Sequence, residues 1–164
     1  MKDMNRTKTF KISLAVQYAS EAELVPSRVQ LRRWISSALM HDAIITIRIV
    51  DEPEGRKLNS EYRGKDYATN VLTFVYDDCL DQVHSKKSFM LCGDVVLCAP
   101  VVEREAALQH KELLAHYAHL TIHAALHLQG YDHADEKNAA AMESLETALM
   151  LKLRYPDPYQ ATRH

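Results

Sequence analysis

Three histidines and one glycine in a short segment constrain this chain more than any other feature of its sequence. His123 and His127 are four residues apart, so a helix would place both imidazoles on one face, one turn apart. Gly130 can adopt a positive φ and end that helix, which lets the chain turn back. The turn would bring His133 toward the other two rings. The spacing therefore predicts a helix and a tight turn that bring three imidazoles together.

Three neutral imidazoles with a fourth position left open are the ligand set of a catalytic zinc, whereas a structural zinc is closed by four protein ligands. Imidazole also suits copper, nickel and iron, but zinc favours open tetrahedral histidine sites. We therefore predict one Zn²⁺ per chain, with His123, His127 and His133 as its ligands. A pair of histidines alone would more often be packed core residues, so the third histidine is what favours a metal site.

The same spacing is that of the zinc-protease signature H-E-x-x-H-x-x-G-x-x-H, with one exception. Ala124 stands where those proteases carry their general-base glutamate. The sequence thus predicts a metal centre that lacks the peptidase base.

Three stretches of the chain carry a resemblance to a known family. Residues 123–133 read H-A-A-L-H-L-Q-G-Y-D-H, residues 58–74 read L-N-S-E-Y-R-G-K-D-Y-A-T-N-V-L-T-F, and residues 93–96 read G-D-V-V. These stretches resemble the YbeY family of endoribonucleases, and the resemblance spans about residues 44–150. The family pattern usually has glycine at Ala124, proline at Ala68 and serine at Thr73. These are exchanges between small or similar side chains.

The resemblance implies a zinc-dependent endoribonuclease that cuts single-stranded RNA in the cytoplasm. It further implies 3′-end maturation of 16S ribosomal RNA and ribosome quality control, with ribosomal RNA and the small ribosomal subunit as partners and neither DNA nor a membrane. Two alternatives stay open. One is a ribosome-assembly factor that contains zinc but cuts nothing, and the other is a metallopeptidase-like hydrolase, against which Ala124 counts.

Two further residues are candidate catalytic groups. Arg63 lies in a basic stretch, and a guanidinium can bind two phosphoryl oxygens at once; the resemblance points to this same arginine. The alternative for Arg63 is a surface salt bridge with Asp66. Asp132 could orient a ligand imidazole or accept a proton, and its alternative is to cap the following helix.

Composition narrows the class of protein. We expect residues 1–164 to form one domain, with flexible tails at 1–9 and 155–164. The net charge of −2 argues against a general nucleic-acid coat protein. Neither a membrane span nor a signal peptide is expected, because the chain has no long apolar run. The three cysteines (Cys79, Cys92 and Cys98) lack C-x-x-C spacing and indicate buried thiols in a reducing cytoplasm.

Hydrophobic periodicity predicts an α+β (α/β-like) domain in which a small four-stranded mixed sheet packs with about five helices. The first two strands should be parallel and joined by a right-handed helical crossover. Pro26 could be the first residue of that crossover helix, and Pro100 should open a long helix that reaches Leu128. The expected strands lie at about 10–16, 43–50, 71–76 and 91–97, and the helices that can be placed lie at about 26–40, 53–62, 100–128 and 135–153.

Overall fold

The computed structural model describes residues 9–76, 90–132 and 134–160. His133, Cys79 and residues 1–8 lie outside them. The described residues form four strands and five helices, in the order β1 (Ile12–Ala19), α1 (Arg28–Ala38), β2 (Asp42–Val50), α2 (Glu52–Arg63), β3 (Val71–Val75), β4 (Met90–Cys98), α3 (Ala99–Leu108), α4 (Leu113–Leu128) and α5 (Glu136–Lys152).

The sheet is mixed, as the sequence predicts. Its strand order is β1-β2-β4-β3, in which β1, β2 and β4 run parallel and β3 pairs with β4 in the antiparallel sense. The predicted parallel pairing of the first two strands is confirmed. The central strand β2 is rich in isoleucine, and Ile45, Ile47 and Ile49 are buried in the core. The predicted α+β domain with a four-stranded mixed sheet and five helices is therefore confirmed.

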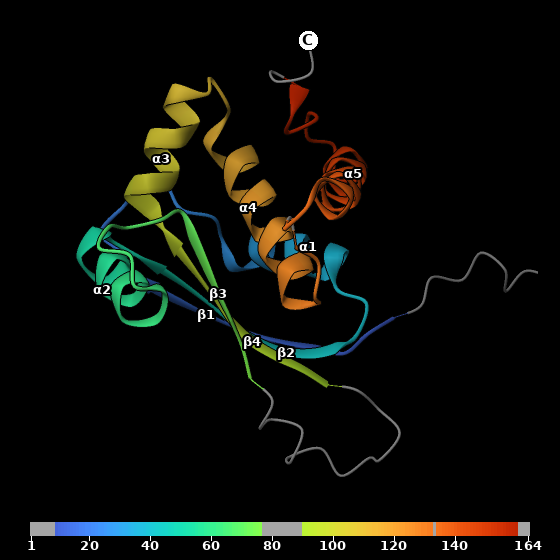
Figure 1. Ribbon diagram of the computed structural model, residues 1–164, viewed down its shortest axis with the longest axis horizontal. Helices are drawn as coiled ribbons and strands as arrows, with labels where there is room; N and C mark the ends of the chain where they lie inside the picture. Colours follow the sequence, from blue (N-terminus) through green and yellow to red (C-terminus); the bar gives the residue numbers. More distant parts are fainter. Residues whose placement is uncertain (1–8, 77–89, 133, 161–164) are drawn as a thin grey trace, which may run out of the picture.

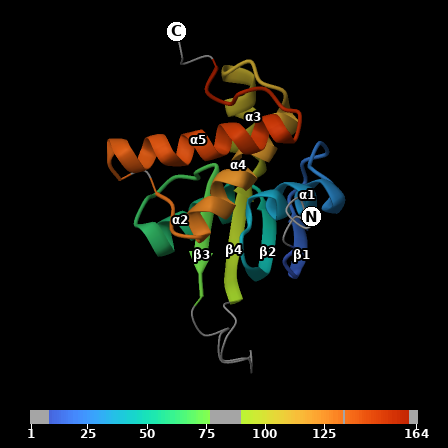
Figure 2. The same ribbon diagram turned by 90° about the vertical axis from the view of Figure 1, so that its right-hand side faces the viewer.

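Helices cover both faces of the sheet, with most of them on one face (Figure 1). Side chains of α1, α4 and α5 join β2 and β4 in the larger core, which includes Trp34, Tyr117 and Met150. Leu58 of α2 packs on a smaller core, which includes Leu72 and Val96, on the other face. Figure 2 shows α5 lying across α4, so α4 lies between the sheet and α5.

The predicted long helix from Pro100 to Leu128 is wrong, because the chain forms two helices there. Helix α3 ends at Leu108 and α4 begins at Leu113. His110, between them, has a φ of 54°, which a helix cannot accommodate. The connecting residues are polar. The apolar stretches before and after them therefore form two separate helices, which pack on each other.

Pro26 is not the first helical residue of α1. Ser27 is the N-cap: its hydroxyl accepts from the Gln30 backbone N–H, and the Gln30 side chain accepts from the Ser27 backbone N–H. Such a reciprocal capping box satisfies two donors that the helix itself leaves without partners.

Residues 155–160 pack against the domain, in contrast to the flexible tail that the sequence predicts there. Tyr155 meets Trp34 edge to face at 6.2 Å between ring centroids, and Pro158 is buried. Side-chain contacts therefore hold this segment against the domain, although its prolines cannot continue the helix.

The cysteines differ from one another. Cys98 is a free, buried thiol, as predicted. Cys92 is buried but disulfide-bonded, so the prediction of reduced cysteines is wrong for this residue. Within the described part of the chain, no helix is long and apolar enough to cross a bilayer.

Candidate metal centre

Helix α4 is buried along most of its length after its first two residues, and the exceptions in that stretch are the histidines of the motif. From Ala115 to Leu128 every residue of the helix is buried except His123 and His127, which are half-buried. Burying the rest of the helix fixes its position, while these two rings keep a route to solvent. The predicted placement of both imidazoles on one helix face is confirmed.

Both rings are oriented by hydrogen bonds at Nδ1. Nδ1 of His123 lies 2.7 Å from a carboxylate oxygen of Glu146, and Nδ1 of His127 lies 3.0 Å from the backbone carbonyl of Tyr131. An ionised carboxylate and a carbonyl only accept, so both Nδ1 atoms donate. In its neutral form each ring then carries its lone pair on Nε2, the arrangement in which a histidine coordinates a metal through Nε2. The ring centroids are 6.4 Å apart and the ring planes nearly parallel.

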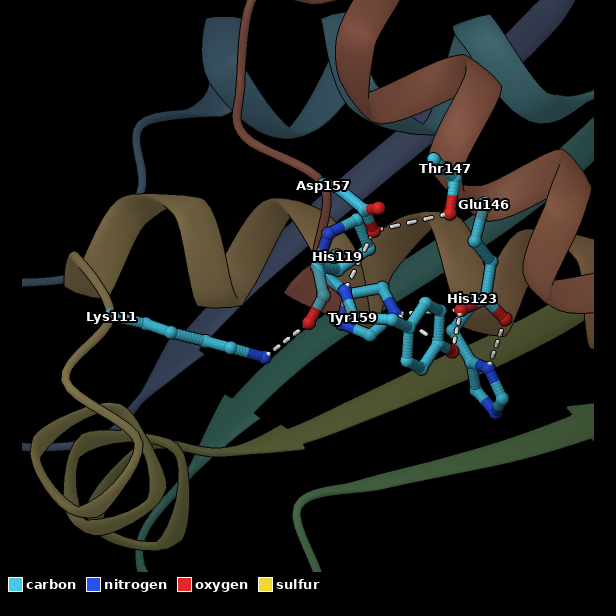
Figure 3. Close-up of polar contacts among 8 residues, drawn as sticks. Lys111, His119, His123, Glu146, Thr147, Asp157 and Tyr159 are labelled. Atoms are coloured by element: carbon cyan, nitrogen blue, oxygen red, sulfur yellow. Dashed lines mark hydrogen bonds and ion pairs between the residues drawn. The ribbon is translucent and has the colours of Figure 1, made fainter. Parts of the chain in front are cut away.

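Glu146 of α5 is the site residue that sequence reasoning missed. The carboxylate is fully buried and accepts hydrogen bonds from His123, from Nε2 of His119 at 2.6 Å and from the hydroxyl of Tyr159 (Figure 3). Burial alone would raise the pKa of Glu146, but these hydrogen bonds lower it to about 2. The carboxylate is therefore ionised and acts as an acceptor only. The sequence does contain a signal for this residue. Glu146 lies four residues after Met142 and four before Met150, and both methionines are buried, so the glutamate lies on the buried face of α5.

His119 also acquires a role from this contact. It is 9% exposed, and its ring nitrogen binds the same carboxylate that orients His123. His119 is thus both packed and part of the network behind the candidate ligands.

The turn after α4 forms as the glycine predicts. Gly130 has a φ of 100°, and the backbone N–H groups of Gly130 and Tyr131 donate back to His127 and Leu126. The chain therefore reverses directly after the second histidine. His133, the third predicted ligand, lies outside the described residues. In the described ranges, no three side chains of the metal-binding types are grouped closely enough to hold an ion.

Asp132 is exposed in this turn. Its carboxylate accepts from the backbone N–H of Ala134 at 3.2 Å. The alternative of capping the next helix is wrong, because Asp135 is the N-cap of α5 and accepts from the Asn138 N–H at 2.8 Å. Glu146 and the Tyr131 carbonyl already orient His123 and His127. The roles that remain for Asp132 are to orient His133 or to accept a proton.

Arg63 lies in the last turn of α2, next to Gly64, whose φ of 68° ends the helix. Its guanidinium is exposed and donates to the backbone carbonyl of Thr73 in β3 at 3.2 Å. The alternative salt bridge with Asp66 is wrong, because Asp66 pairs with Arg56 at 2.8 Å. Strand β3 in turn contacts α4, which carries the histidines.

A close contact fixes α4 against the sheet. A Cβ added to Gly93 of β4 would lie 2.8 Å from the Phe74 carbonyl and 2.9 Å from a methyl group of Leu128. Only a glycine allows the end of α4 to approach the sheet this closely. This contact lies one residue after His127, so it helps to set the position of the candidate ligand.

Comparisons with known proteins agree with these features. The family model described as Endoribonuclease YbeY matches residues 8–154. A protein of Nitrosospira multiformis named Endoribonuclease YbeY is 54% identical over 94% of this chain and 85% of its own length. One of the same name from Methylobacillus flagellatus is 52% identical over 93% of this chain and 97% of its own length. The solution structure of TM1509 from Thermotoga maritima superposes with a TM-score of 0.50 at 21% identity, covering 85% of this chain and 91% of that one, which supports the fold.

Proposed function

We propose that this chain, which belongs to the Endoribonuclease YbeY family, hydrolyses phosphodiester bonds in single-stranded RNA at a zinc centre made by His123, His127 and His133. The observation that carries the proposal is the pair of Nδ1 hydrogen bonds, because they leave the metal-binding lone pair of both described histidines on Nε2. A carboxylate or carbonyl behind a ligand histidine is the usual support of a catalytic metal site.

The donor set fits zinc, since nitrogen ligands from three histidines leave a position open for water. Zinc bound there would lower the pKa of its water to roughly 7 and so supply hydroxide at neutral pH. A zinc-bound hydroxide needs no separate strong base. This is consistent with Ala124 standing where a protease carries its general-base glutamate. The buried Glu146 keeps His123 in one orientation, and the turn at Gly130 reverses the chain after His127.

Arg63 is proposed to bind the phosphate. Its guanidinium is exposed, and its bond to the Thr73 carbonyl uses only one of its N–H groups. A bidentate contact to the phosphoryl oxygens would stabilise the charge that builds up on them during cleavage. The nearby Lys57 and Lys65 are exposed and would add contacts to the RNA backbone.

We propose ribosomal RNA in the small ribosomal subunit as the substrate, with maturation of the 16S 3′ end in the cytoplasm and clearance of defective ribosomes as the cellular tasks. The names of the relatives support RNA as the substrate class. An overall charge of −2 supports a local contact with one RNA segment rather than coating of long nucleic acid.

The test is a cleavage assay on a 16S precursor fragment that contains both single-stranded and paired regions. The parent protein should cut the single-stranded region, and His127→Ala should leave it intact. His41→Ala is a matched control because His41 lies directly before β2, outside the motif, and it should cut like the parent. RNA binding without cleavage by the parent would favour the non-catalytic assembly factor, and digestion of casein would favour a peptidase.

A further inference from the structure

We propose that Glu146 and Tyr159 are positioning residues of the metal centre, and that they hold His123 in the tautomer that presents Nε2 to the metal. The inference rests on the proposed zinc site. It assigns a function to the C-terminal segment of this chain, because Tyr159 lies beyond the stretch 8–154 that the family model matches.

The Glu146 carboxylate connects α5 to α4 and to the C-terminal segment. One oxygen, Oε2, accepts from His123, and the other, Oε1, accepts from His119 and from the Tyr159 hydroxyl. Its side chain is 1% exposed, so no solvent competes for these positions. A buried carboxylate with this set of donors cannot rotate without losing several hydrogen bonds, and the imidazole of His123 is therefore fixed with it.

The C-terminal segment is held in place by its own contacts. The Lys111 ammonium donates to the Pro158 carbonyl at 2.9 Å, and the Tyr159 backbone N–H donates to the Asp157 carboxylate at 2.8 Å. The Tyr159 ring meets His119 edge to face at 5.3 Å between centroids. Figure 3 shows Tyr159 reaching from this segment to Glu146 beside His119 and His123. The segment thus holds the Tyr159 ring against His119 and its hydroxyl on the Glu146 carboxylate.

Replacing the carboxylate by an amide has a specific expected effect. In Glu146→Gln the amide carbonyl should face His119 and Tyr159, because these provide two donors, whereas His123 provides one. The amide NH₂ would then face Nδ1 of His123, which must become an acceptor. The proton of that ring moves to Nε2, and the metal-binding lone pair is lost.

Two measurements test this. The first is ¹⁵N NMR of the imidazole tautomers in metal-free protein, which should show His123 protonated at Nδ1 in the parent and at Nε2 in Glu146→Gln. The second is zinc affinity by competition with a chromophoric chelator. We expect affinity to fall about 10- to 100-fold in Glu146→Gln, the scale for losing a partner behind a ligand. Tyr159→Phe should keep the tautomer, since two donors remain, and its zinc affinity should fall by a smaller factor, about tenfold.

Matched controls separate positioning from general stability. Glu143→Gln removes the same charge one turn earlier on α5, and Tyr155→Phe removes the same hydroxyl from the tyrosine that packs on Trp34. Both should bind zinc like the parent. An unchanged tautomer and unchanged affinity in Glu146→Gln would overturn the inference. If that variant does not fold, Tyr159→Phe decides, because affinity equal to that of Tyr155→Phe would overturn it too. A parent protein that binds no zinc would instead contradict the proposed function.

Discussion

The guanidinium of Arg63 donates to the backbone carbonyl of Thr73, which connects the last turn of α2 to the edge strand of the sheet. The contact is a single exposed hydrogen bond, and the side chain has no part in either core cluster. It orients the arginine without making the fold depend on it, so the effects of its substitution on RNA cleavage and on stability can be separated.

We predict that Arg63→Ala lowers the rate of RNA cleavage by about 100-fold or more, the scale for removing one group that stabilises transition-state charge. Arg63→Lys should recover only part of the rate, because an ammonium keeps the charge but loses the bidentate geometry. Single-turnover cleavage gives the rates, and the melting temperature and zinc content should change little.

Arg32→Ala is a matched control for this prediction. Arg32 is also exposed, and it likewise donates one hydrogen bond to a strand carbonyl, that of Ile12 at 3.0 Å. This variant should cut RNA like the parent. If Arg63→Ala and Arg32→Ala both retain the parental rate, Arg63 is a surface residue and the metal alone accounts for the chemistry.

Restoring the protease glutamate should damage the protein and produce no peptidase. Ala124 is fully buried in the main core, so Ala124→Glu would place a carboxylate among apolar side chains. We expect a loss of about 3 kcal/mol or more in the free energy of unfolding. Urea denaturation measures this loss, and Ala141→Glu, at an exposed position on α5, should cost little. A stable Ala124→Glu variant that digests casein would contradict both parts of the prediction.

A second histidine–carboxylate pair gives a pH dependence. Glu105 of α3 lies 2.9 Å from Nε2 of the buried His116 and accepts from the Asn70 amide at 3.0 Å. Burial alone would raise the pKa of Glu105, but these two hydrogen bonds hold it below its usual value of 4.5. Because the folded state has the lower pKa, the stabilisation is fully present above pH 4.5 and is lost as the pH falls through the folded pKa.

The measurement is urea denaturation of the metal-free parent and of Glu105→Gln at several pH values. The parent should be the more stable protein near neutral pH, and the difference should shrink as the pH falls below 4.5. Glu103→Gln, on the same helix, should show no such trend. A difference between parent and Glu105→Gln that stays constant into acid would contradict the assignment.

The sequence predicted the part of the site that depends on local spacing. Histidines four residues apart on a helix, and a glycine that ends the helix, determine the placement of His123 and His127 whatever packs around them. Glu146 could not be found in this way, because its contact with His123 depends on how α5 crosses α4. That crossing is set by long-range packing, which no local pattern encodes.

The fold shows the same division. Alternation and apolar stripes predicted all four strands and the parallel start of the sheet. The break between α3 and α4 was missed because neither glycine nor proline marks it, and His110 adopts the positive φ instead. The packing of residues 155–160 was missed because Tyr155 and Tyr159 are anchored by partners distant in sequence, Trp34 and Glu146.

The most direct test of the central claim is the restoration of RNA cleavage by zinc. Protein stripped of metal with a chelator and dialysed should leave the 16S precursor fragment intact. On stepwise addition of zinc, cleavage should rise in proportion to bound metal and saturate at about one zinc per chain, the stoichiometry of a single catalytic site. His123→Ala with His127→Ala in one protein should remain inactive throughout the titration. Full cleavage by the metal-free parent, or by this double variant, would contradict the account.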